Sequence, residues 1–69
     1  MFSEKIEIAL IKRKMSKAEL ARQLGTTPQA LYSKLNRNAL REEDMKRIAE
    51  ILGMRLEINF VMLDTGEIF

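Results

Sequence analysis

Hydrophobic residues recur three and four positions apart through most of the chain, the spacing that places them on one face of a helix. Leu31 and Leu35 are one example, and Ile48, Ala49 and Leu52 are another. Polar and charged residues fill the positions between them, so each segment would bury one face and expose the other. The pattern predicts four helices, over about residues 4–14, 17–24, 28–36 and 42–52.

The two middle segments carry start and stop signals. Ser16 and Glu19 have the S-x-x-E spacing of a capping box, in which each side chain accepts a hydrogen bond from the other residue's backbone N–H. Gly25 stands where a left-handed residue ends a helix without a Cβ clash. Thr27 and Pro28 suit the cap and the first position of the next helix. We therefore expect two short helices joined by a tight turn.

The last segment changes from a helical to an alternating period. A half-buried strand is predicted over about residues 55–62, followed by a turn at residues 63–67 that contains Asp-Thr-Gly. A two-stranded hairpin is marginal by itself, and no other strand is evident in the chain. We therefore expect antiparallel pairing with the same segment of a second copy. The alternating apolar residues would be the dimer contacts: Leu56, Ile58, Phe60 and Met62.

The composition excludes several kinds of site. The 69 residues suffice for one small, mainly α domain over residues 1–69, with the β hairpin at its C-terminal end. The chain contains no Cys and no His, so disulfides and the usual zinc ligand sets are missing, and we expect no metal and no cofactor. The same absence removes the commonest general acid–base and thiol nucleophile, and we expect no enzyme. The acidic run 42–44 fits the first turn of a helix, where the dipole favours negative charge.

Neither end of the chain indicates a membrane protein. The first ten residues lack a signal-peptide pattern, and no apolar run is long enough to span a bilayer. We therefore expect a cytoplasmic protein with no membrane partner. A single small domain also leaves no room for an effector domain, so we expect no small-molecule effector.

Charge is divided unevenly along the chain. Residues 1–41 contain nine Lys or Arg against three Glu, a net charge of +6, whereas residues 42–69 contain three Lys or Arg against seven acidic residues, a net charge of −4. A basic half suggests that one side of the molecule faces a polyanion such as DNA. An ordinary solvated surface explains the same division equally well.

Two short helices joined by three residues have the geometry of a helix-turn-helix, whose second helix enters the major groove of DNA. At 100° per residue, the face of the third helix opposite Leu31 and Leu35 contains Gln29, Ser33 and Asn36. That face is polar yet nearly uncharged. An αα-hairpin in a generic helical bundle is the alternative explanation of the same geometry.

The segment SKAELARQLGTTPQALYSKLNR, residues 16–37, resembles the helix-turn-helix of the lambda-repressor-like family, the Cro and Xre type of bacterial and phage regulators. The matching residues are Ala21, Gly25 and Leu31, supported by Leu20 and Leu24. The resemblance covers about residues 4–52, and the LEINF and DTGE segments are similar to the tail of some small Xre-type proteins. Many family members have Gln at the position of Lys17 and an apolar residue at that of Lys34, so this chain departs from the pattern there.

The resemblance implies two sets of DNA-contacting residues. Base-reading residues would be Thr27, Pro28, Gln29, Tyr32, Ser33 and Asn36. Phosphate-contacting residues would be Lys17, Arg22, Lys34 and Arg37, together with the N-terminal amides of the second and third helices. For Arg22 and Lys34, a merely solvated charge is an equal alternative.

Two functions follow from these observations. The first is a sequence-specific, homodimeric transcriptional regulator of double-stranded DNA, acting as a repressor at half-sites about 34 Å apart. The second is a protein-interaction module such as an antitoxin, which would hold a partner protein through the strand or through Ile8 and Ile11. These two isoleucines lie partly off the inward stripe of the first helix, where they are either wide core contacts or a partner surface.

Overall fold

The computed structural model describes residues 2–69, and four helices lie in that range. They are α1 (Phe2–Arg13), α2 (Lys17–Leu24), α3 (Pro28–Asn36) and α4 (Glu42–Ile51). The prediction of a mainly helical fold with four helices is therefore confirmed. The largest difference in extent is at α1, which begins at Phe2 instead of near residue 4.

The four helices enclose one small apolar core. Its members are all at most 4% exposed, and each helix contributes, with Leu52 following directly after α4. No polar or charged residue in the described range is buried with them. The core consists of Ile6, Leu10, Leu20, Ala21, Leu31, Leu35, Ile48 and Leu52.

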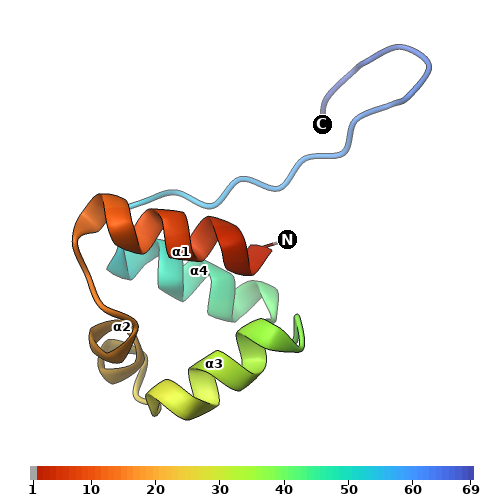
Figure 1. Cartoon of the computed structure of the whole chain (residues 1–69). Helices are drawn as coiled ribbons and strands as arrows, with labels where there is room; N and C mark the ends of the chain where they lie inside the picture. The colour runs from red at the N-terminus through yellow and green to blue at the C-terminus, as the bar shows by residue number, and fades with distance from the viewer. Residues whose placement is uncertain (1) are drawn as a thin grey trace.

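Figure 1 shows α1 and α4 running across one side of the domain, with α2 and α3 on the other. α2 packs against both α3 and α4, and α1 also contacts α3. α1 and α4 flank an apolar groove, lined by Phe2 and Ala9 on one side and by Met45 and Ala49 on the other. None of the described helices has the length and apolar character needed to cross a bilayer.

The helix ends form largely as the local signals predicted. The hydroxyl of Ser16 accepts a hydrogen bond from the Glu19 N–H at 3.1 Å, and Thr27 Oγ1 accepts one from the Ala30 N–H at 3.1 Å. Gly25 ends α2 in the left-handed conformation, with φ 75°. Only half of the predicted capping box is present in the described residues, because the Glu19 carboxylate accepts hydrogen bonds from Arg22 and Gln23 instead of from Ser16.

The predicted strand over residues 55–62 is wrong. Residues 54–60 have no regular secondary structure, and the single β-bridge in residues 2–69 joins Val61 to Ile68 in antiparallel orientation. The alternating pattern is present, but the described chain offers no neighbouring strand to complete a sheet, and a lone pair of strands is marginal. In Figure 1 this tail leaves the end of α4 as an extended tube that folds back at its tip.

The tip of the tail is nevertheless ordered by backbone hydrogen bonds. Phe60 and Phe69 exchange two of them, at 2.7 and 2.9 Å, and their rings stack with centroids 5.9 Å apart. Met62 O accepts from the Gly66 N–H, and the Met62 N–H donates to Glu67 O. With Gly66 at φ 76°, this is a turn closed by a glycine bulge. The predicted turn is therefore present without the predicted strand.

Candidate nucleic-acid interface

α2 and α3 form a compact helix-turn-helix. Three residues, 25–27, separate the end of α2 from Pro28, the first residue of α3. The Thr26 N–H donates to Ala21 O at 2.9 Å, which turns the chain back over the last turn of α2. Ala21 is completely buried in α2, and α2 packs against α3. The short turn and its hydrogen bond thus keep the two helices adjacent.

The outward face of α3 presents hydrogen-bonding groups without charge. Leu31 and Leu35 point into the core, so the remaining faces of the helix are solvent-exposed. Within residues 2–69, no protein group is hydrogen-bonded to the side-chain amides of Gln29 and Asn36, so both remain available to a ligand. All six predicted base-reading residues are exposed: Thr27, Pro28, Gln29, Tyr32, Ser33 and Asn36.

Two of these six also have structural roles. Thr27 Oγ1 is engaged as the acceptor that caps α3, although its hydroxyl can still donate. Pro28 occupies the first position of α3, where the missing N–H leaves no helical hydrogen bond unmade. Thr27 and Pro28 therefore have fewer hydrogen-bonding groups available to a ligand than Gln29 and Asn36 have.

The arrangement agrees with what comparison with known proteins finds. Residues 5–57 match the family of Cro/C1-type HTH DNA-binding domains. The chain belongs to that family. No curated protein and no solved structure gives a significant match. The family match covers most of α1, all of α2, α3 and α4, and the first residues after α4, and it confirms the resemblance seen in residues 16–37.

Of the four cations predicted to contact the DNA backbone in this Cro/C1-type domain, two are unpaired. Lys34 and Arg37 are exposed near the C-terminal end of α3, and neither forms an ion pair within the described residues 2–69. Arg37 Nε donates to Ser33 O at 3.3 Å, which directs the guanidinium along the helix end. These two charges are free to meet an anion.

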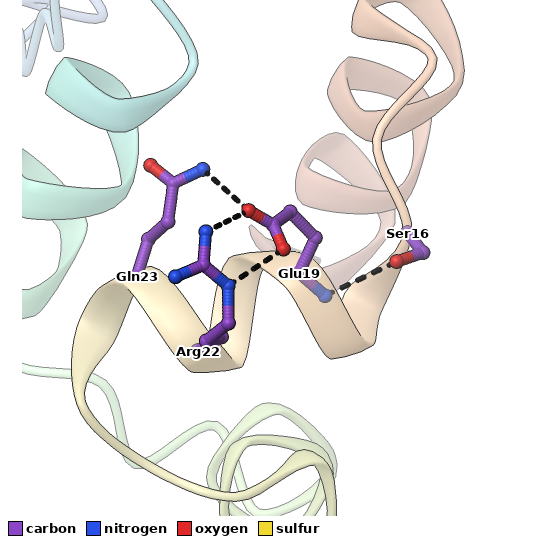
Figure 2. A network of polar contacts seen from close by, with 4 residues as sticks. All are labelled: Ser16, Glu19, Arg22 and Gln23. Atoms are coloured by element: carbon purple, nitrogen blue, oxygen red, sulfur yellow. Dashed lines mark hydrogen bonds and ion pairs between the residues drawn. The ribbon is translucent and has the colours of Figure 1, made fainter.

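Arg22 is instead held by a carboxylate of its own helix. Figure 2 shows the guanidinium of Arg22 and the amide of Gln23 both turned toward Glu19 on the surface of α2. Arg22 Nε donates to Glu19 Oε2 at 2.8 Å, and Gln23 Nε2 donates to Oε1 at 3.1 Å. The hydrogen bonds from Arg22 and then Gln23 lower the pKa of Glu19 to about 2. Glu19 therefore stays ionised at neutral pH, and the charge of Arg22 is offset.

Lys17 is also paired, but with a residue of another helix. Its Nζ lies 2.5 Å from Glu7 Oε1 on α1 and 5.5 Å from the centroid of the Tyr32 ring on α3. The hydrogen bond to Glu7 raises the pKa of Lys17 above its usual value, so the ammonium is retained at neutral pH. The ammonium of Lys17, in the first turn of α2, therefore lies close to both α1 and the outward face of α3.

Glu7 was not singled out in the sequence, and Glu19 was predicted only as a capping residue of α2. Glu19 and Arg22 are three positions apart on a helix, a spacing at which opposite charges meet, so their pairing was readable in principle. Glu7 and Lys17 are ten positions apart on different helices. Only the tertiary fold, which places the first turn of α2 against the middle of α1 at this point, brings them together.

The four predicted dimer residues occupy two different environments. Leu56 is half-buried and lies at the groove between α1 and α4. Ile58, Phe60 and Met62 are exposed along the tail. The structure adds Ile68 and Phe69 to this exposed apolar set, so the tail carries most of the solvent-exposed large apolar side chains of the described residues.

Proposed function

We propose that the protein is a homodimeric, cytoplasmic transcriptional regulator that represses by occupying a specific duplex sequence. The proposal rests chiefly on the exposed, uncharged polar face of α3, beside the first turn of α2. Amide and hydroxyl groups can pair with the edges of bases in the major groove, whereas contacts to phosphate carry no sequence information directly. The lack of Cys and His supports a role in binding and not in catalysis.

The chemistry of the α3 face suits a site that contains A·T pairs. Gln29 and Asn36 each carry a donor and an acceptor that fit adenine bidentately, and Ser33 can donate or accept. The Tyr32 ring and Pro28 are apolar groups that suit a thymine methyl. The proposed base-reading set is Thr27, Pro28, Gln29, Tyr32, Ser33 and Asn36.

Backbone contacts would fix the position of α3 on the duplex. Lys34 and Arg37 are the first candidates because no carboxylate of the described chain neutralises them. The N-terminal N–H groups of α2 and α3 are further phosphate donors. Lys17 and Arg22 can contribute fully only if phosphate displaces the carboxylates of Glu7 and Glu19.

The proposed dimer forms through the tail. Phe60 directs its backbone N–H and C=O toward Phe69, so the same groups of Asn59 and Val61 point to the outer edge. A second copy of this edge, antiparallel to the first, would satisfy them and make a four-stranded sheet. The apolar side chains of the paired segments, with Phe60 at 71% exposure, would then be cross-strand neighbours and would partly cover one another.

Selection from a pool of randomised duplexes tests the proposal. The protein is expected to enrich a two-fold symmetric sequence with half-site centres about 10 base pairs apart, because a dimer places its recognition helices one DNA turn apart. Phe60→Asp should sediment as a monomer and enrich only one half-site. Ile8→Asp adds the same charge at a 54% exposed position on α1, outside the tail, and is the matched control.

The proposed dimer would be contradicted by a protein that sediments as a monomer and enriches no symmetric site. If the Phe60→Asp variant dimerises as strongly as the unaltered protein, the protein is a dimer whose interface does not include the tail. The alternative of an antitoxin-like module gains support from a different observation, since Ile8 and Ile11 are exposed on α1 and do not belong to the tail. A monomer that enriches no duplex at all would favour that alternative.

A further inference from the structure

One ion pair joins a residue outside the helix-turn-helix to a residue at the edge of the proposed DNA-binding face. Glu7 belongs to α1, and its Oε1 lies 2.5 Å from the ammonium of Lys17 in the first turn of α2. The same ammonium lies 5.5 Å from the ring centroid of Tyr32. Because Tyr32 is exposed on the outward face of α3, Glu7 holds a cation at the edge of the proposed interface.

This pair is exposed enough for another anion to compete. The side chains of Lys17 and Glu7 keep 41% and 51% of their accessible surface. An ion pair this exposed contributes little to folding stability. A DNA phosphate near α2 is therefore an alternative partner for the ammonium, and the Glu7 carboxylate would then face the duplex without compensation.

We infer that Glu7 competes with DNA phosphate for the Lys17 ammonium and so restrains the affinity of the protein for duplex DNA of any sequence. Glu7 is a positioning residue in this account, because it acts through Lys17. The inference rests on the proposed DNA binding and assigns a role to a residue outside the two helices of the motif. It also separates Lys17 from Lys34 and Arg37, which have no such competitor within the described residues.

Glu7→Gln tests the inference by releasing Lys17. The expected result is a steeper salt dependence of binding to a mixed-sequence duplex, with the slope of log K against log salt changed by about 0.9, the value for one added phosphate contact. At about 0.1 M salt, one such contact is expected to raise the affinity by at most about eightfold. Fluorescence anisotropy at several salt concentrations measures both quantities.

Two matched variants separate this effect from a change in net charge. Glu50→Gln removes the same charge from the exposed surface of α4 and should leave the slope unchanged. In a Lys17→Gln background, Glu7→Gln should no longer steepen the slope. Tyr32 is the only tyrosine, and the chain has no tryptophan, so tyrosine emission reports on the ring directly. In the absence of DNA, the tyrosine emission of the Glu7→Gln variant should differ from that of the unaltered protein and resemble that of the Lys17→Gln variant more closely.

The outcomes distinguish this inference from the proposed function. If the unaltered protein binds DNA with a salt-dependent affinity and Glu7→Gln has the same slope, the competition is refuted and DNA binding stands. A shallower slope in Glu7→Gln would also refute it, because Glu7 would then hold Lys17 in place for phosphate. If the unaltered protein does not bind DNA, both proposals are overturned.

Discussion

Leu20→Ala is expected to lower the free energy of unfolding by about 2–5 kcal/mol, the range for removing a large aliphatic side chain from a packed core. Leu20 has no exposed surface and lies in α2, which contacts both α3 and α4. A domain of 69 residues has a total stability of roughly 3–10 kcal/mol. If the unaltered protein lies near the lower end of this range, the variant would be largely or wholly unfolded. Urea denaturation followed by circular dichroism measures the change.

Leu63→Ala is the matched control for this core variant. Leu63 is at the tip of the tail with 101% exposure, so the same chemical change there should alter the stability by less than about 0.5 kcal/mol. DNA binding by Leu20→Ala should be lost together with its helical signal, because the helix-turn-helix depends on the shared core. A Leu20→Ala protein as stable as the Leu63→Ala protein would show that the core is not assembled as described.

Gln29→Ala is expected to weaken binding to the preferred duplex by about 1–3 kcal/mol, or roughly 5- to 150-fold, and to relax selectivity at one base pair. The reason is that Gln29 is exposed on α3, with its amide not engaged by the described protein, and a glutamine amide pairs bidentately with adenine. Competition between the selected duplex and its single-base-pair variants measures both effects.

Gln23→Ala provides the control for the base-reading variant. Gln23 is the same residue type on α2, but its amide donates to Glu19 on the helix surface. The Gln23 variant should keep the sequence preference of the unaltered protein. An equal loss of affinity on every duplex after Gln29→Ala would show that Gln29 does not read a base.

Local chemistry explains why the helical part of the fold was predictable. Ser16, Gly25, Thr27 and Pro28 act within one helical turn of their own positions, and each has its expected role in the structure. The inward stripes were readable for the same reason, since the period of a helix is a property of the segment alone. The exposed face of α3 then followed, because it is the face opposite Leu31 and Leu35.

The tail was mispredicted because a strand is not a local structure. The alternation after residue 54 describes a segment suited to a sheet, but a strand exists only when another strand supplies its hydrogen bonds. Within the described chain, this condition is met only at the tip, where Phe60 and Val61 meet Ile68 and Phe69. The turn was predictable, since Gly66 supplies the positive φ that closes it.

The sequence did not predict which carboxylates pair with the cations of the candidate interface. The sequence predicted no partner for Lys17 or Arg22, whereas in the structure they form ion pairs with Glu7 and Glu19. The Glu19 carboxylate was predicted to accept a hydrogen bond from the Ser16 backbone N–H, but it accepts from Arg22 instead. A guanidinium is a charged donor and forms a stronger hydrogen bond to a carboxylate than a backbone N–H does. Such competition between partners depends on packing and cannot be read from spacing alone.

Direct titration of a duplex tests the central claim, that the exposed face of α3 and the cations around it bind DNA. A labelled mixed-sequence duplex of about 30 base pairs is titrated with the protein and followed by fluorescence anisotropy at several salt concentrations. The account predicts binding with a dissociation constant on the order of 1–100 µM near physiological salt, weakening steeply as salt is raised. No binding at about 50 mM salt would contradict the account, because phosphate contacts are strongest there.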